Sequence, residues 1–195
     1  MGISGGLDPA KMIDQEHSYS LCILAGGKGR RFGGQDKGLI EYKGIPLVEH
    51  LIEEFCRYTD DIIISANRNL GRYKKYKRAV VTDSTQEFAG PLAGTVAACT
   101  SSKNDWLFIV ACDQPDINHT LATNMLTLAK SSNSNLIVTN DGYRNQPLPM
   151  LLHTSLQNTI ENFLNSRERK VGLWQTQQNA IVLKTDRHKR SININ

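Results

Sequence analysis

The residues best suited to chemistry lie in one segment, residues 21–38. An apolar run, Leu-Cys-Ile-Leu-Ala, leads into a loop rich in glycine and cations that ends in Asp36-Lys37-Gly38. Glycines lack a Cβ atom, so backbone N–H groups can approach an anion closely while lysine and arginine supply charge. We therefore expect this segment to bind a polyphosphate. The residues concerned are Gly26, Gly27, Lys28, Gly29, Arg30, Arg31 and Lys37.

Two better-known phosphate loops do not match this segment. Around Gly27-Lys28, a Walker A loop would need glycine where Cys22 stands and a hydroxyl residue where Gly29 stands. A dinucleotide-binding fingerprint starting at Gly27 would need glycine or alanine in place of Phe32. A merely solvated loop is the remaining alternative, and the strand directly before it favours binding.

A second candidate is Asp113, which ends the apolar run 108–112 and precedes Gln114-Pro115. Magnesium is usually held by one or two carboxylates together with water and substrate phosphates, so one aspartate at a strand end is sufficient. We expect Asp113 to bind Mg²⁺. Alternatively, Asp113 caps the following helix, although Asp116 can serve as that cap.

A third group of polar residues follows two other predicted strands. Asp83 ends the run 79–82, while Ser65 and Asn67 follow 62–64. In open α/β sheets ligands bind beyond the carboxyl ends of the strands, so these residues should lie at one edge. A carboxylate there can accept hydrogen bonds from N1–H and the exocyclic amine of guanine, and Ser65 or Asn67 could contact the base. Asp83 could instead cap a turn.

Apolar runs of strand length alternate with longer amphipathic segments, which predicts an α/β fold. We expect a single-domain, Rossmann-like, three-layer α/β/α structure with a mostly parallel sheet in residues 19–195. Residues 1–18 are predicted to be a flexible leader, partly added before a natural start at Met12, and 140–149 a turn between strands. Predicted strands are 20–25, 61–66, 79–82, 106–112, 135–139, 148–153 and 180–184. Two predicted helices begin at Pro46 and Pro91, and two further predicted helices cover residues 120–130 and 155–164.

Composition narrows the partners and the compartment. The net charge of +4 and pI near 8.9 suit anionic ligands, and residues 68–78 form the densest basic run. No nucleic-acid motif accompanies that run, so a solvated helix face is favoured and no nucleic-acid partner is expected. The sequence has no apolar stretch long enough for a bilayer and no signal peptide, which predicts a cytoplasmic protein without membrane contact. The scattered cysteines, expected to be buried and reduced, are Cys22, Cys56, Cys99 and Cys112.

Residues 24–34, with Asp36-Lys37, resemble the signature of nucleotidyltransferases of the sugar-nucleotide type. The continuation over residues 33–39 is similar to the molybdenum cofactor guanylyltransferases, and the resemblance covers nearly all of residues 19–195. It implies a nucleotide-diphospho-sugar transferase-like fold that transfers GMP from GTP to the terminal phosphate of molybdopterin and releases pyrophosphate. It also implies Mg²⁺ as cofactor and transient contact with other cofactor-biosynthesis proteins.

The resemblance assigns roles to individual residues. Lys37, Arg31 and Asp113 are implied to be catalytic, and Phe88–Gly94 resembles the family's second glycine motif. The family often has asparagine where this chain has Ser65. The implied nucleotide-binding residues are Leu24, Ala25, Gly26, Gly27, Lys37, Ser65, Asn67, Asp83, Gly90 and Asp113.

The acceptor side is implied by residues 141–147 and 167–171, where Arg144, Arg169 and Lys170 offer cations for an acidic pterin phosphate. These cations could equally be surface charge. Asn193 and Asn195 resemble an Asn-x-Asn segment near the family's metal, and the sequence ends where the family continues with a Thr-Pro-Glu-type helix.

Three alternatives remain open. The protein could use CTP on molybdopterin, or another nucleotide on a sugar phosphate, with the same loop and metal site. It could be a noncatalytic GTP-binding module. A nucleic-acid-binding role through residues 68–78 is the third alternative, and it would show strong salt dependence.

Overall fold

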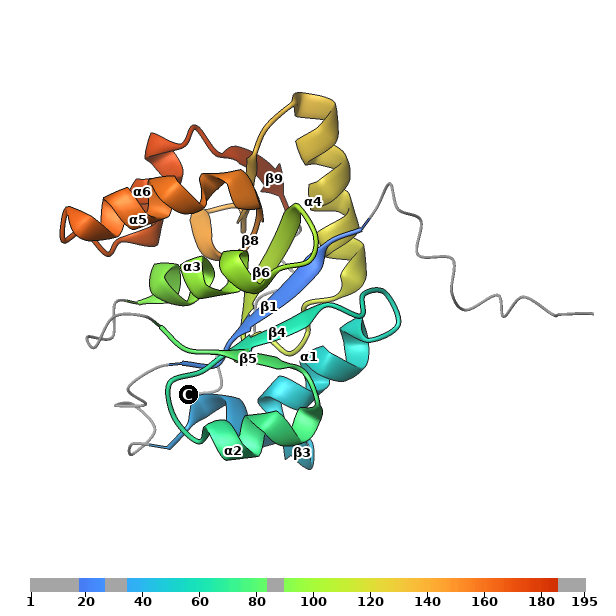
Figure 1. The fold of residues 1–195 in the computed structure, drawn as a ribbon. Helices are drawn as coiled ribbons and strands as arrows, with labels where there is room; N and C mark the ends of the chain where they lie inside the picture. The colour runs from blue at the N-terminus through green and yellow to red at the C-terminus, as the bar shows by residue number, and fades with distance from the viewer. Residues whose placement is uncertain (1–17, 27–34, 84–89, 186–195) are drawn as a thin grey trace, which may run out of the picture.

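The fold is built on a seven-stranded sheet in the order β5-β4-β1-β6-β8-β7-β9 (Figure 1). It is seen in a computed structural model that describes residues 18–26, 35–83 and 90–185. The strands are β1 (Ser20–Leu24), β4 (Ile62–Ser65), β5 (Ala79–Val81), β6 (Trp106–Ala111), β7 (Leu136–Asn140), β8 (Asn145–His153) and β9 (Ile181–Lys184).

The sheet is mostly parallel, as predicted. Strands β5, β4, β1 and β6 run side by side in one direction, with Leu21 opposite both Ile62 and Phe108. Strand β8 is antiparallel to β6 and β7, while β7 and β9 are parallel. Central parallel strands are buried on both faces, which explains why β1 and β4 are nearly continuous apolar sequence.

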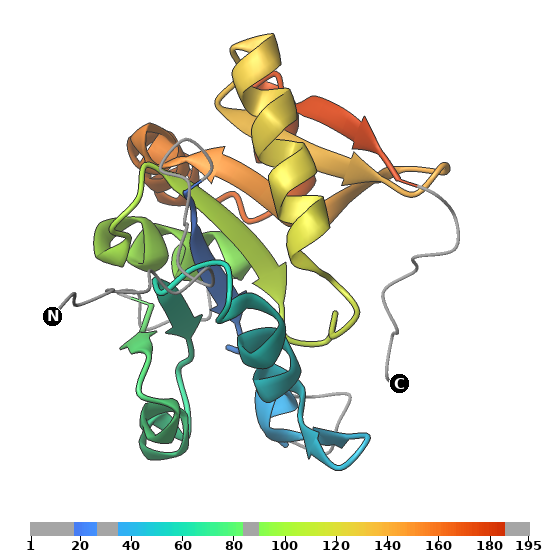
Figure 2. The same cartoon turned by 90° about the vertical axis from the view of Figure 1, so that its right-hand side faces the viewer.

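Helices cover both faces of the sheet and complete the predicted three layers. Alternate residues of β1 point to opposite faces, so Leu21 and Ile23 join one core and Cys22 and Leu24 the other. Figure 2 shows the first of these faces, with α4 and α1 in front of the sheet. That layer holds α1 (Leu47–Phe55), α2 (Leu70–Tyr73) and α4 (His119–Ser132), and the other holds α3 (Pro91–Ser101), α5 (Gln157–Asn165) and α6 (Val171–Gln177).

Several local elements were not predicted. These are α6, the small hairpin of β2 (Glu41–Tyr42) and β3 (Ile45–Pro46), and the short 3₁₀ turns η4 (Lys37–Leu39), η5 (Lys74–Tyr76) and η6 (Thr154–Leu156).

No helix among the described residues is both long enough and apolar enough to cross a bilayer. The expectation of four buried thiols was wrong for Cys56, which is exposed.

The turn predicted over residues 140–149 is shorter than expected. The Asp141 carboxylate accepts N–H bonds from Tyr143 and Arg144, both at 3.0 Å, and so closes the chain within residues 141–144. Strand β8 therefore already begins at Asn145, directly opposite Asn140. Because these local hydrogen bonds close a tight turn, the chain is already extended at Asn145. The strand is therefore longer than its apolar residues alone indicate.

A buried polar network fixes the amino-terminal edge of the sheet. Asp61 is only 4% exposed, and its Oδ2 accepts hydrogen bonds from Ser20 Oγ at 2.5 Å and from Lys103 N–H at 2.8 Å. Ser20 Oγ also accepts from the Asn104 N–H at 3.2 Å. The network therefore joins the starts of β1 and β4 to the loop between α3 and β6, and it satisfies a carboxylate that burial would otherwise penalise.

Replacing Asp61 with alanine should lower the free energy of unfolding by about 2–3 kcal/mol, because buried donors lose their charged acceptor. Asp60 is the matched control, since it is exposed and adjacent. Asp60→Ala should stay within about 0.5 kcal/mol of the parent protein. Urea unfolding of both variants measures the difference, and equal stabilities would show that the network contributes nothing.

Candidate active site

Four strand ends meet at one edge of the sheet, as the sequence predicted. Strands β5, β4, β1 and β6 are parallel neighbours, so their carboxyl ends coincide. The pairing continues past the strands, since Cys112 N–H donates to Leu24 O at 3.1 Å and Ala66 N–H donates to Val81 O at 3.0 Å. Asn67, Asp83 and Asp113 follow these strands and are placed along this edge, where α/β sheets bind ligands.

Lys37 and Asp113 form an ion pair across this edge. The lysine opens η4, directly after the glycine-rich segment, and its Nζ contacts Asp113 Oδ2. Both side chains are only partly exposed, 30% for Lys37 and 18% for Asp113. The structure therefore brings together the cation and the carboxylate that the sequence singled out, although 76 positions separate them in the chain.

Asn67 and Asp83 form a reciprocal pair on the neighbouring strand ends. Asn67 Nδ2 donates to Asp83 Oδ2 at 2.8 Å, and the Asp83 N–H donates back to Asn67 Oδ1 at 3.0 Å. Burial raises the pKa of Asp83 above its ordinary value of 3.8, while the hydrogen bond from Asn67 opposes that rise. The Asn67 side-chain amide therefore orients Asp83. From the sequence alone, this role of Asn67 could not be distinguished from direct contact with a base.

The end of β1 differs from the expectation in one respect. Gly26 was expected to offer a backbone N–H to phosphate, but this N–H donates to Ser65 O at 3.0 Å, and Ala25 N–H donates to the same oxygen at 2.9 Å. The β1–β4 ladder therefore extends over Gly26 and occupies its donor. Gly26 nevertheless lies beside the Asn67 side chain, because a Cβ there would lie 3.4 Å from Asn67 Nδ2.

Ser65 is the last residue of β4, and Gly90 directly precedes α3. Ser65 is 2% exposed, and a base contact through its hydroxyl stays a prediction. Gly90 has φ +79° and ψ −168°, a conformation that side chains other than hydrogen rarely allow, and it precedes Pro91 at the first turn of α3. Glycine at this position lets the helix start abruptly beside the carboxyl edge.

Comparison with known proteins identifies the family. The family model for the MobA-like NTP transferase domain matches residues 21–180. The chain belongs to this family. MobA-like NTP transferases are nucleotidyltransferases, so the protein is an enzyme of that class, as the resemblance of residues 24–34 and Asp36-Lys37 implied.

Curated relatives bear out the narrower resemblance as well. The chain is 38% identical over 174 residues to a molybdenum cofactor guanylyltransferase of Shewanella putrefaciens, with 89% of each chain covered. It is 38% identical to the protein of the same name from Shewanella piezotolerans, covering 91% of this chain and 88% of that one.

Solved structures confirm the nucleotide-diphospho-sugar transferase-like fold. Molybdopterin-guanine dinucleotide biosynthesis protein A from Archaeoglobus fulgidus has a TM-score of 0.69 at 18% identity, covering 87% of this chain and 84% of that one. The 2-C-methyl-D-erythritol 4-phosphate cytidylyltransferase from Thermus thermophilus also has a TM-score of 0.69, at 12% identity, covering 90% and 93%. The fold is thus shared by a cytidylyltransferase, and it does not by itself select the base.

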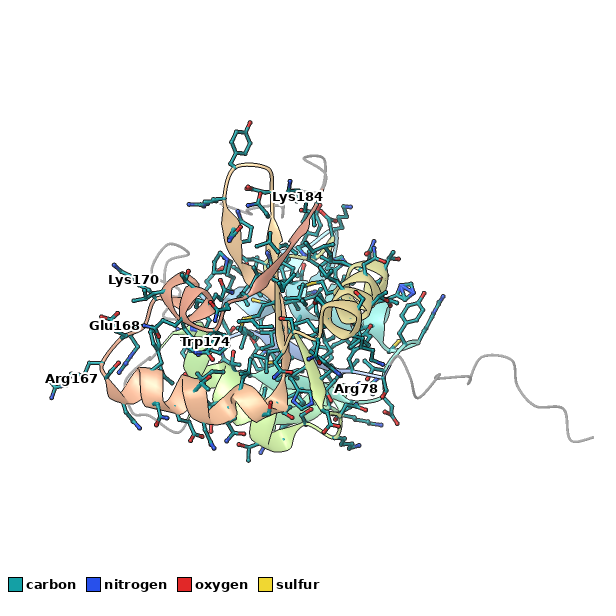
Figure 3. All side chains as sticks on the ribbon, turned by 90° about the horizontal axis from the view of Figure 1, so that it is seen from above. Arg78, Arg167, Glu168, Lys170, Trp174 and Lys184 are labelled. Carbon is teal, nitrogen blue, oxygen red and sulfur yellow. The ribbon has the colours of Figure 1, made fainter. Side chains whose placement is uncertain are left out.

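Of the three cations predicted to bind the acceptor of this MobA-like chain, Arg144 lies in the β7–β8 turn. Strand β7 points the same way as β6, so this turn is at the same edge of the sheet as Asp113. Arg169 donates to the carbonyls of Leu164 and Glu168, both at 2.7 Å, and thereby caps the end of α5. Figure 3 shows Lys170 projecting outward from the connection between α5 and α6. Acceptor binding by these three cations stays a prediction.

The remaining predicted site residues lie outside the described part of the chain. These are Gly27, Arg31, Asn193 and Asn195. Within residues 18–26, 35–83 and 90–185 there is no cluster of three or more histidine, cysteine, aspartate or glutamate side chains that would enclose a metal. The carboxylate of Asp113 is a hard oxygen donor, and it fits a cation such as Mg²⁺ that takes its other ligands from water and substrate phosphates.

Helix α3 of this MobA-like domain packs closely on the ends of β1 and β4. A Cβ at Gly94 would overlap Ser65 Oγ and lie 2.9 Å from Leu24 Cδ2. Gly94→Ala should therefore lower the melting temperature, although alanine is the better helix former by about 1 kcal/mol. Gly172 in α6 is the control, because a Cβ there meets nothing within 4 Å, and Gly172→Ala should raise the melting temperature. Stabilisation by both changes would contradict the close packing at Gly94.

Proposed function

We propose that this protein transfers GMP from GTP to the terminal phosphate of molybdopterin, releasing pyrophosphate. The observation that carries the proposal is the placement of the Lys37–Asp113 pair and the Asn67–Asp83 pair on one sheet edge. The first pair supplies a cation and a carboxylate suited to a triphosphate with a divalent ion. The second supplies an oriented carboxylate suited to a base. The names of the curated relatives support the same reaction.

Guanine fits Asp83 better than cytosine does. Guanine presents two adjacent donors, N1–H and the exocyclic amine, whereas the Watson–Crick edge of cytosine presents a single amine beside acceptors. An ionised carboxylate only accepts hydrogen bonds, and each of its oxygens can accept more than one. Asn67 therefore can hold Asp83 Oδ2 while the carboxylate still receives both guanine donors.

The protein's part in the reaction is positioning and charge neutralisation. An oxygen of the molybdopterin phosphate attacks the α-phosphorus of GTP, and the bond from that phosphorus to the β-phosphate oxygen breaks. Mg²⁺, held by Asp113, would supply positive charge to the phosphates. Lys37 would move its ammonium from Asp113 onto the triphosphate and stabilise the charge that develops on the leaving pyrophosphate.

The test offers GTP, CTP, UTP and ATP separately to the purified protein with Mg²⁺ and molybdopterin. Pyrophosphate release and formation of the dinucleotide are measured together. We expect both with GTP only. Transfer from CTP alone would contradict the base assignment, and GTP binding without pyrophosphate release would favour a noncatalytic GTP-binding module.

Asp113→Asn should lower turnover by roughly a hundredfold or more, because one preorganised electrostatic contact contributes about 3 kcal/mol to such a transition state. The fold should persist, since the substitution keeps the size of a partly exposed side chain. Asp116→Asn is the control, because Asp116 is exposed three residues further along the same loop. Pyrophosphate release gives the rates, and near-normal turnover by Asp113→Asn would reject the assignment.

The preference for GTP over CTP should fall on acidification. Burial raises the pKa of Asp83, so the carboxylate is protonated at a higher pH than an ordinary aspartate and then ceases to accept both guanine donors. Calorimetry at several pH values gives the dissociation constant for CTP divided by that for GTP, and this ratio cancels the titration of the triphosphate itself. Asp83→Asn should lower the ratio at every pH. A ratio in that variant equal to that of the parent protein would contradict the assignment.

A further inference from the structure

A carboxylate directly before Lys37 is held by one short segment from another part of the chain. Both oxygens of Asp36 accept hydrogen bonds: Oδ1 from Tyr73 Oη at 2.5 Å and Oδ2 from Asn69 Nδ2 at 3.0 Å. Tyr73 is fully buried at the end of α2, and Asn69 has a left-handed backbone with φ 51° just before that helix. Neither residue was singled out by the sequence, where they lie within a basic run.

The residue directly after Lys37 contacts the same tyrosine. A Cβ at Gly38 would lie 2.5 Å from Tyr73 Oη and 3.0 Å from the Ala25 Cβ. Gly38 therefore packs between the tyrosine hydroxyl and the end of β1, with no space for a side chain. One phenol group thus contacts the residues on both sides of Lys37.

This arrangement restricts the backbone from which the lysine projects. A lysine side chain has four flexible bonds, and ordering it costs up to about 2 kcal/mol. A fixed backbone at residues 36–38 leaves that side chain as the only part to be ordered when its ammonium approaches an anion. Burial and the Asp36 carboxylate raise the pKa of Tyr73 far above its ordinary value, so the phenol remains a hydrogen-bond donor.

We propose that Tyr73 is a positioning residue for the transfer reaction: through Asp36 and Gly38 it fixes the backbone around Lys37 and so directs the lysine ammonium toward Asp113 and the triphosphate. This inference rests on the proposed function, in which Lys37 binds the phosphates of GTP. The alternative is that Tyr73 only fills the core beneath α2. In that case loss of its hydroxyl would affect stability but not the interaction of Lys37 with nucleotide.

The test compares Tyr73→Phe with Tyr76→Phe. Both changes remove a phenol–carboxylate hydrogen bond from neighbouring turns, but Tyr76 Oη donates to Glu49 Oε2 in α1, at 3.3 Å, instead of to Asp36. Tyr73→Phe should raise the dissociation constant for GTP with Mg²⁺ by about tenfold, in keeping with a hydrogen bond to a charged group. Tyr76→Phe should change it less than about twofold. Thermal melting shows that both variants are folded at the temperature of the binding measurement.

A double-mutant cycle separates positioning from a general structural effect. In a Lys37→Met background, Tyr73→Phe should have almost no further effect on GTP affinity, because it acts through the lysine. Asp36 is partly exposed and does not fill the core, so Asp36→Asn should leave the fold intact. This variant should also weaken GTP binding, and it tests the inference if Tyr73→Phe fails to fold.

The same loss of affinity from Tyr73→Phe in both backgrounds would overturn the inference. A Tyr73→Phe variant with the affinity of Tyr76→Phe would also overturn it, while leaving transfer by the parent protein and the proposed function intact. Absence of both GTP binding and transfer in the parent protein would instead remove the proposed function and the inference together.

Discussion

The parallel pairing of β5, β4, β1 and β6 is the constraint on which the rest of the site depends. Parallel strands must be joined by crossovers, so residues far apart in sequence end at the same edge of the sheet. Asn67, Asp83 and Asp113 each lie two residues beyond the end of their strand and so reach that edge. Lys37 reaches it from the chain that follows β1. No single segment contains the site, and it exists only when the sheet is formed.

Three carboxylates, those of Asp36, Asp83 and Asp113, are each held by a partner from another element. Lys37 pairs with Asp113, Asp83 with Asn67, and Asp36 with Tyr73 and Asn69. Such pairs limit the cost of partly burying charge, and they orient the groups before a ligand arrives. A nucleotide would then exchange one set of polar contacts for another instead of ordering the side chains from a disordered state.

The sheet could be predicted because its central strands are buried on both faces and are therefore almost purely apolar. Asp113 and Asp83 could be predicted because each directly follows such a run. The α6 helix could not, since Val171 and Trp174 are its only large buried apolar residues and a glycine interrupts it. The Gly26 donor was misassigned because β1–β4 pairing continues beyond the apolar residues. Tyr73 was missed because an isolated buried aromatic residue within a basic run has the same sequence pattern as an exposed one.

The most direct test of the account is a crystal structure with Mg²⁺ and a GTP analogue that cannot be cleaved at the α-phosphorus. The account predicts guanine against the Asp83 carboxylate, with Lys37 Nζ within hydrogen-bond distance of a phosphate oxygen. A nucleotide bound away from the carboxyl edge of β1, or one whose phosphates lie out of reach of Lys37, would contradict it.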